Sequence, residues 1–412
     1  MKKSTSQGGN TELICLMALL MSLVALTIDA VLPALGEMGD SLGVKNPNDN
    51  QLVIYTFFFG LSIGQMFYGP LSDSYGRKKP VYLGISILIL GSLFSILATN
   101  FTFLLIGRAC QGFGAATCRI IPMAMIRDKL EGREMARVMS LILVIFIMVP
   151  ALAPSIGQVI LFVAGWRSIF GFILIIGVFA MLWFVIRQPE TLPIERRQAF
   201  SVATIISGVI ETCKNPIARY YTIASGMIYG AFLGYLSSAQ QILQVQYDLG
   251  KAFSLYFGGL AIAIGLSSFV TSKLVMRFGM EKLSFLSLLM LSIFSCVFYL
   301  YSRNFLGHPN LHIFLTYMAV TFFSFGVLFG TFNSMALQPM GHIAGVATSV
   351  ISFVQMLLSV AVGGAIGQSY NGTVLPLVLG FFLCGFFPMI IMIYVRKCVA
   401  GRPMPTVAVS KR

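Results

Sequence analysis

The chain has 412 residues, of which 57% are hydrophobic and only 10% are charged. About a quarter of the residues of a soluble domain are charged, so the composition excludes a soluble enzyme, a disordered chain and a disulfide-rich scaffold. The 28 Lys and Arg exceed the 14 Asp and Glu and give a net charge of +14, which by itself fits either a nucleic acid or a membrane as partner.

Apolar segments long enough to cross a bilayer follow one another along the chain, since a spanning helix needs about 20 apolar residues. The first is too long to be the apolar core of a signal peptide. None shows the alternation of a membrane β-strand. The sequence therefore predicts an all-α membrane protein with twelve spans, at approximately 12–35, 51–71, 80–98, 102–126, 136–161, 167–187, 217–246, 252–274, 283–302, 312–338, 344–369 and 374–396.

The distribution of Lys and Arg predicts the orientation of these spans. If the N-terminus is cytoplasmic, 22 of the 28 cations fall at the inner side of the spans and four at the outer side. Cytoplasmic loops of membrane proteins carry such an excess. The basic charge therefore indicates a multi-pass protein with both termini in the cytoplasm, and it gives no indication of nucleic-acid binding.

The first span contains Asp29, the one acidic residue of the chain that lies well inside an apolar segment. A charge inside a span is costly and is a functional hypothesis by default. At 1.5 Å per residue, Asp29 and Arg108 of the fourth span lie at matched depth, roughly 9 Å below the outer boundary. Burial disfavours the charged carboxylate and a nearby arginine favours it, so we expect this pair to couple protonation to conformation. The alternative is a fixed ion pair that only joins two helices.

The second span carries polar and aromatic residues on one face. Tyr55 and Phe58 lie on this helical face together with Ser62, and we take Tyr55 and Phe58 as candidates for substrate binding.

The loop after the second span reads GPLSDSYGRKK over residues 69–79. Its glycines permit a tight turn and its aspartate can cap a helix. We expect an inner gate at four of its residues, Gly69, Asp73, Gly76 and Arg77.

The fourth span continues from Arg108 as RACQGFGAA over residues 108–116 and later carries a second cation, Arg119. Gln111 and Arg119 are further candidates for substrate binding, and Gly112 for a conformational motif. Arg119 could attract an anionic group of a substrate, or it could extend toward the inner interface as long basic side chains do.

The fifth span contains PALAPSIGQ over residues 150–158. Pro150, Pro154 and Gly157 predict a flexing helix interface, and a proline kink of purely structural purpose is the alternative.

The longest polar stretch divides the chain. We expect an N-terminal six-helix bundle over residues 1–187, a cytoplasmic linker over 188–216, and a C-terminal six-helix bundle with a short cytoplasmic tail over 217–412. Residues 278–281 after the eighth span weakly repeat the tyrosine-glycine turn after the second, as expected of parallel halves.

In the second half, aromatic and amide residues are candidates for a loosely selective pocket, although packing is the commoner role of each aromatic. The candidates are Tyr229, Phe232, Tyr235 and Asn333. The seven cysteines and three histidines are scattered, so neither a disulfide framework nor a metal site is supported. We expect no cofactor.

Three of these motifs resemble family signatures. Residues 69–79 resemble the major facilitator signature G-x-L-x-D-x-x-G-R-K/R-x between helices 2 and 3. Residues 108–116 resemble the R-x-x-Q-G-x-G-A-A motif of proton-driven drug antiporters, in which the Arg is implicated in proton coupling. Residues 150–158 are similar to the antiporter motif G-P-x-x-G-G, with Ala153 and Gln158 in place of two glycines.

Further segments resemble bicyclomycin-resistance/CflA-type exporters. These are IDAVLPAL at residues 28–35 and the central loop QPETLPIERRQ at residues 188–198. The match covers most of the N-terminal half, while the C-terminal half matches mainly in its pattern of spans. Arg119 is not part of these motifs, and could reflect a substrate preference of this protein.

The resemblance implies a monomeric drug:proton antiporter of the bacterial inner membrane that exports small, amphiphilic organic molecules by alternating access between two six-helix bundles. Its implied partners are the substrate, the proton and the lipid bilayer. The main alternative is a proton-coupled metabolite or nutrient symporter on the same fold. A membrane-embedded enzyme is disfavoured because no span holds a nucleophile–base or metal constellation, and a passive channel stays open as a third possibility.

Overall fold

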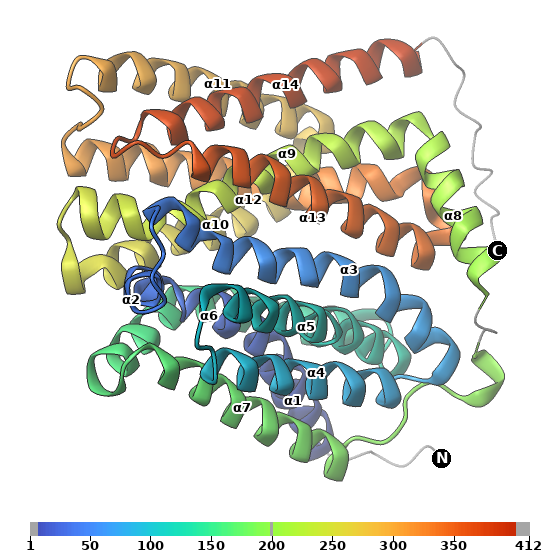
Figure 1. Ribbon diagram of the computed structural model, residues 1–412. Coiled ribbons are helices and arrows are strands. Elements are labelled where there is room, and N and C mark those ends of the chain that lie inside the picture. Colours follow the sequence, from blue (N-terminus) through green and yellow to red (C-terminus); the bar gives the residue numbers. More distant parts are fainter. Residues whose placement is uncertain (1–6, 198–200, 401–412) are drawn as a thin grey trace.

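Helices account for the regular structure of this computed structural model, which describes residues 7–197 and 201–400; no strand occurs in these two ranges. Twelve of the described helices have between 19 and 33 residues, enough at 1.5 Å per residue to cross a hydrocarbon core of about 30 Å. In Figure 1 they lie roughly side by side, with the blue-to-green helices in the lower half and the yellow-to-red ones in the upper half. The predicted all-α architecture with twelve long helices is confirmed.

The N-terminal group of helices comprises six long helices and one short one. They are α1 (Gln7–Asp29), α2 (Leu35–Ser41), α3 (Leu52–Tyr75), α4 (Lys78–Ile96), α5 (Phe101–Lys129), α6 (Gly132–Ala164) and α7 (Trp166–Arg187).

The C-terminal group contains the other six long helices. They are α9 (Pro216–Ala239), α10 (Phe253–Phe278), α11 (Met280–Arg303), α12 (Leu311–Leu337), α13 (Ala344–Gln368) and α14 (Leu375–Ala400). The two groups touch mainly where α3 packs against α13 and where α6 packs against α10.

Eight apolar segments of the described chain are long enough to span a membrane, and one of them, 311–368, contains both α12 and α13. Helix α5 is not among the eight and is the least apolar of the long helices, because several of its side chains are polar and buried, Arg108 and Gln111 among them.

Two ends of the bundle are distinguished below. The basic end is where α3 ends at Tyr75 and α4 begins at Lys78, and the far end is where a 3₁₀ turn, η2 (Pro47–Gln51), leads into α3. Successive long helices therefore run in alternating directions between the two ends.

The first predicted span is not one continuous helix. Helix α1 stops at Asp29 and the chain resumes as a short 3₁₀ turn, η1 (Leu32–Ala34), followed by α2. Pro33 has no N–H to donate to the carbonyl of Asp29 four residues earlier, which accounts for the interruption directly after this residue.

The polar stretch between the two groups contains a helix that the sequence did not predict. Helix α8 (Val202–Lys214) packs against α13 and α9 at the basic end, and in Figure 1 it runs across one end of the bundle. Ile206 and Ile210 on this helix are about half exposed, as expected for an amphipathic helix that lies along a membrane surface.

Candidate functional site

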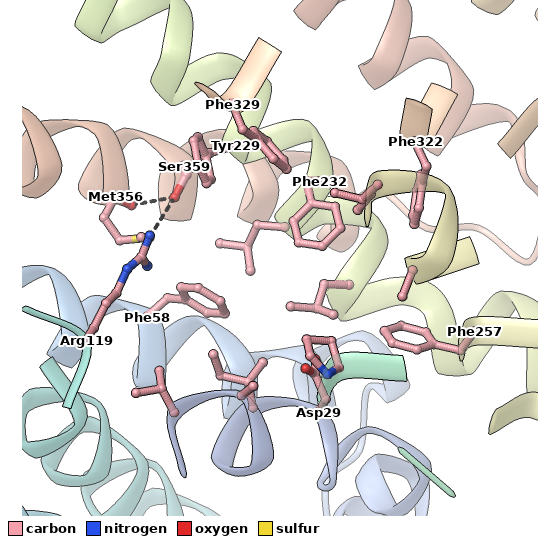
Figure 2. A pocket seen from close by; sticks show the side chains of 18 residues that line it. Asp29, Phe58, Arg119, Tyr229, Phe232, Phe257, Phe322, Phe329, Met356 and Ser359 are labelled. Atoms are coloured by element: carbon pink, nitrogen blue, oxygen red, sulfur yellow. Dashed lines mark hydrogen bonds between the residues drawn. The ribbon is translucent and has the colours of Figure 1, made fainter. Parts of the chain in front are cut away.

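A cavity of about 230 Å³ lies between the two groups of helices (Figure 2). Its walls come from α1, α3, α5 and α6 on one side and from α9, α10, α12 and α13 on the other. Most lining side chains are apolar, with a few polar groups among them, as is usual for ligand sites. We call it the central cavity.

Asp29 lies on the wall of the central cavity, at the point where α1 ends. Only 5% of its surface is exposed. Its carboxylate has no hydrogen-bond or ion-pair partner within the described part of the chain. The sequence predicts a functional acid inside the first span. In the structure, this carboxylate faces the central cavity at a break in the helix.

Arg108 does not pair with Asp29, so the predicted ion pair is wrong. The guanidinium is fully buried. It donates to the carbonyl oxygens of Thr27 and Val53, each at 3.0 Å, and to Oε1 of Gln111 at 2.9 Å. The two residues do lie at matched depth, because Thr27 is two residues from Asp29. Depth along a helix does not determine which way a side chain points, and Arg108 points to the backbones of α1 and α3.

Gln111 therefore supports Arg108 and is not part of the cavity wall. Its amide nitrogen donates to the hydroxyl of Ser92 on α4 at 2.8 Å. The Arg108 guanidinium also lies over the ring of Phe57, 4.7 Å from its centroid. A role of Arg108 in proton coupling stays a prediction, and these contacts would make it act through the backbone of α1.

Arg119 does line the central cavity, as predicted for a substrate contact. Its side chain crosses from α5 toward the C-terminal group, where it reaches hydrogen-bonding distance of the Tyr229 hydroxyl and extends toward Ser359 (Figure 2). None of the ion pairs found in the described ranges involves Arg119.

Aromatic rings form much of the remaining wall. Three of them, Phe58, Tyr229 and Phe232, were predicted as substrate candidates. Tyr229 stacks on Phe329 with ring centroids 4.2 Å apart. The lining residues Phe257, Met356 and Ser359 were missed, since nothing in their local sequence separates them from ordinary packing residues.

Three predicted candidates lie elsewhere. Tyr235 is fully buried behind the wall, stacked on Phe257. Asn333 is half-buried on α12 and does not line the central cavity. Tyr55 belongs to a polar contact at the far end.

This contact, the far-end network, joins the two groups of helices. The Tyr55 hydroxyl donates to the Gly363 carbonyl oxygen at 2.8 Å and hydrogen-bonds the Ser237 hydroxyl. Gln51 Nε2 donates to Oε1 of Gln241 at 2.6 Å and to the Gly367 carbonyl oxygen at 3.0 Å. All of these groups are neutral, so the far end is held shut between α3, α9 and α13 without an ion pair among these residues.

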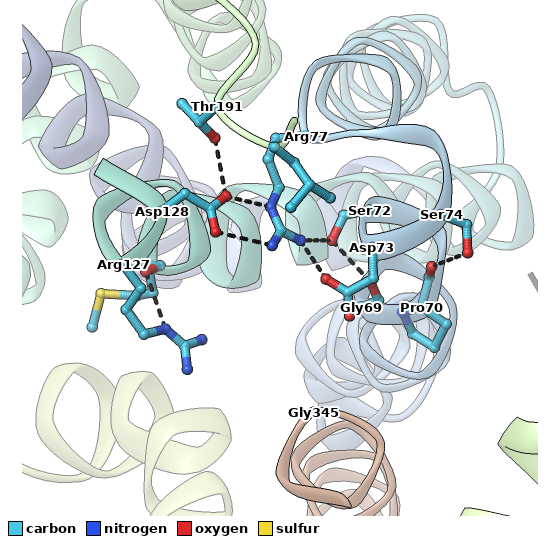
Figure 3. Close-up of polar contacts among 12 residues, drawn as sticks. Gly69, Pro70, Ser72, Asp73, Ser74, Arg77, Arg127, Asp128, Thr191 and Gly345 are labelled. Atoms are coloured by element: carbon cyan, nitrogen blue, oxygen red, sulfur yellow. Dashed lines mark hydrogen bonds and ion pairs between the residues drawn. The ribbon is translucent and has the colours of Figure 1, made fainter. Parts of the chain in front are cut away.

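The basic end carries a charged counterpart, the basic-end network (Figure 3). The Arg77 guanidinium donates to both Asp128 carboxylate oxygens, at 2.8 and 3.3 Å, and pairs with Asp73. Thr191 donates to the same Asp128 at 3.1 Å. Burial alone would lower the pKa of Arg77, but the hydrogen bonds with Asp128 and Asp73 outweigh burial and raise it.

The segment after α7 is tied to the same place by Glu190. Gly76 has a φ of +88°, a conformation that favours glycine, and turns the backbone so that the N–H groups of Arg77 and Lys78 donate to the Glu190 carboxylate at 2.9 and 3.2 Å. Partial burial would raise the pKa of this carboxylate. The bonds from the backbone N–H groups of Arg77 and Lys78, together with those from Thr191 and Leu192, outweigh burial and lower the pKa.

The predicted glycine and proline positions are sites of close helix packing. A Cβ at Gly112 would overlap the carbonyl oxygen of Phe57, and one at Gly157 would overlap that of Ala30, next to Asp29. At Gly69, α3 approaches Ser349 of α13. Helix α6 continues through Pro150 and Pro154, and Pro150 borders the central cavity. Their roles in gating stay predictions.

Comparison with known proteins gives similar chains of similar length. An MFS-type transporter of Bacillus subtilis (strain 168) named YdgK, itself described as uncharacterized, is 30% identical over 357 residues, which are 85% of this chain and 87% of the relative. The bicyclomycin resistance protein homolog of Haemophilus influenzae is 26% identical over 87% of this chain and 89% of the relative. The multidrug resistance protein MdtL of Vibrio parahaemolyticus is 28% identical over 89% and 92% of the two chains.

Solved structures show the same fold at low identity. A partially occluded, inward-open form of the xylose transporter XylE from E. coli superposes with a TM-score of 0.73 at 13% identity, over 97% of this chain and all of the other. The family model of the Major Facilitator Superfamily matches residues 17–364. With most of the chain matched, and with two six-helix groups around a central cavity, the protein belongs to the Major Facilitator Superfamily.

Proposed function

We propose that this protein is a proton-driven secondary transporter that exports small organic molecules by alternating access. The observation that carries the proposal is Asp29, a carboxylate that faces the central cavity from a helix break and has no partner in the described part of the chain.

An unpaired charge inside a membrane protein is costly, so this carboxylate gains from either of two ligands. A proton neutralises it, and a cationic group of a substrate compensates it. Two ligands that compete for one site displace each other by the same factor, which is the requirement for exchanging a proton for a substrate.

The names of the bicyclomycin and multidrug resistance relatives support export. A D-xylose–proton symporter shares the fold, with a TM-score of 0.71 at 14% identity. It fits the symporter alternative only loosely, because the likeness concerns the fold alone. Transport direction is therefore the measurement that separates the two.

In this proposal, residues 1–187 and 217–412 form two bundles that rock about the central cavity, with residues 188–216 between them. The basic end faces the cytoplasm of a bacterial inner membrane, as the excess of Lys and Arg predicts. The terminal residues 1–6 and 401–412 lie outside the described ranges. At about 230 Å³ the cavity is smaller than the roughly 300–1,000 Å³ of common ligand pockets, so a drug-sized substrate requires the bundles to separate further.

The test uses everted membrane vesicles whose lumen is acidified by respiration. A growth-inhibition panel first identifies a transported compound, and its accumulation in the vesicles is then followed. The wild type should accumulate the compound against its gradient, and Asp29→Asn should lose this uphill transport while still exchanging labelled for unlabelled compound. Asp40→Asn, an exposed acid on α2, is the matched control and should behave as the wild type.

Uphill transport by Asp29→Asn would refute the proton-carrier role. Movement of the compound out of the acidified lumen would support symport. An exchange rate that does not saturate as the compound concentration rises would indicate a channel.

A further inference from the structure

Two charged side chains of opposite sign face the central cavity. Asp29 and Arg119 both line it, and neither has an ion-pair partner among the described residues. The other ionisable lining residue is Tyr229, which lies within hydrogen-bonding reach of Arg119. The cavity therefore offers one uncompensated anionic site and one uncompensated cationic site to a ligand.

These two sites lie at different depths. The bond from Arg108 to the carbonyl oxygen of Thr27 aligns Arg108 with the end of α1, next to Asp29. Arg119 follows eleven residues later on the same helix, roughly 16 Å closer to the basic end. Figure 2 shows the two side chains separated in the same way, with Phe58 between them.

The wall between the two charges suits an apolar, flat molecular body. Phe58 comes from α3, while Tyr229, Phe232 and Phe329 come from α9 and α12. The Phe232 ring meets the Phe329 ring nearly edge-on, 5.6 Å between centroids, and both rings border the cavity, where they offer apolar surface to an aromatic body.

The sign of charge at Asp29 decides which substrates can be exchanged for a proton. A cationic group competes with the proton for the carboxylate. An anionic group nearby does the reverse and favours the protonated form, so a purely anionic substrate would move together with a proton. A purely cationic substrate would leave Arg119 without a counter-ion and would be repelled by it.

We propose that the exported substrate is a zwitterion with an apolar body, whose cationic nitrogen binds Asp29 and whose anionic group binds Arg119. This inference rests on the proposed function, because only proton exchange requires a cation at Asp29. Arg119 then selects among substrates, with Tyr229 beside it.

The experiment compares three probes with one rigid body. They are a biphenyl with an aminomethyl group at one end and a carboxylate at the other, the biphenyl with the aminomethyl group alone, and the biphenyl with the carboxylate alone. Dissociation constants are measured by calorimetry on the purified full-length protein in detergent micelles. A weakly buffered solution with an indicator dye reports protons released or taken up on binding.

The wild type should bind the zwitterion at least about tenfold more tightly than either singly charged probe, since each end makes a charge-assisted contact. The zwitterion and the amine should release protons, and the carboxylate should not. Arg119→Gln should weaken the zwitterion about tenfold and leave the amine unchanged or tighter, while Arg119→Lys should keep part of the preference.

Arg127→Gln removes an exposed cation from the same helix and should change none of the three affinities. Equal binding of all three probes to the wild type, or an unchanged zwitterion affinity in Arg119→Gln, would overturn the substrate class. If instead Asp29→Asn still released protons on binding the amine, the proposed function itself would fail. The methyl ester of the zwitterion lacks the anionic group that would bind Arg119. The wild type should therefore bind the ester more weakly than the zwitterion, as Arg119→Gln binds the zwitterion more weakly.

Discussion

Tyr55 gives the sharpest test of how the far end is held shut. Its hydroxyl donates its one proton to the carbonyl oxygen of Gly363 and can accept a hydrogen bond from the Ser237 hydroxyl, both in the C-terminal group. Tyr55→Phe removes the two bonds that cross between the groups and keeps the ring. At about 0.5–1.5 kcal/mol net for each bond, the change weakens the closed far end by about 1–3 kcal/mol, which raises the open population roughly 5- to 150-fold.

The assay is a distance distribution between spin labels at Lys45 and Asn304, two exposed far-end positions in different groups, in a protein without its native cysteines. Tyr55→Phe should enlarge the long-distance population. Tyr68→Phe is the matched control, because Tyr68 lies on the same helix, is equally buried, and has a hydroxyl without a hydrogen-bond partner in the described structure.

An unchanged distribution in Tyr55→Phe would refute the far-end role, as would the same shift in Tyr68→Phe. Altered discrimination among substrates without a change in distance would instead restore Tyr55 to the substrate site that the sequence predicts.

Three further outcomes are expected. The pKa of Glu190 is lowered in the folded protein, so its contribution to stability is complete above the ordinary carboxyl pKa of 4.5 and is lost as pH falls through the lower native value. Glu190→Gln should therefore reduce the melting temperature at pH 7, and the melting temperature of this variant should fall less steeply in acid than that of the wild type. Gly112→Ala forces a Cβ against the backbone of α3 and should destabilise by about 1–3 kcal/mol in thermal unfolding, whereas Gly330→Ala, which has open space, should not. Arg77→Lys keeps the charge but loses the paired contact with Asp128, which also accepts a bond from Thr191 of the segment after α7, so trypsin should cut this segment at Arg196 or Arg197 faster than in the wild type.

The sequence was informative where charge was rare. Asp29 stood out because almost no other acid lies inside a span, and the structure places it on the central cavity. Its predicted partner was wrong because matched depth leaves the direction of a side chain open. The helix break after Asp29 follows from Pro33, a local signal that hydropathy alone does not register.

Neutral polar residues were harder to interpret. Tyr55 and Ser237 are 182 residues apart in the chain, and Gln51 and Gly367 are 316 apart. A glutamine or tyrosine near the end of a span looks the same whether it faces water, lipid or another helix. Only the packing of α13 against both α3 and α9 turns these side chains into one network.

The basic end of the bundle is held by charged groups and the far end by neutral amides and hydroxyls. Because of this difference, we expect the pH dependence of transport to depend on one residue, Asp29. The basic-end network is charged but joins parts of the N-terminal group and the segment after it. The far-end bonds cross between the groups through amides and hydroxyls, which do not titrate near neutral pH. In the proposed cycle, a change of pH therefore acts on far-end opening through Asp29. The rate of exchange of labelled for unlabelled compound should follow a single titration that disappears in Asp29→Asn and persists in His342→Gln, which removes the imidazole that bonds Glu211 at the basic end. A profile that shifts with His342 instead would contradict this reasoning.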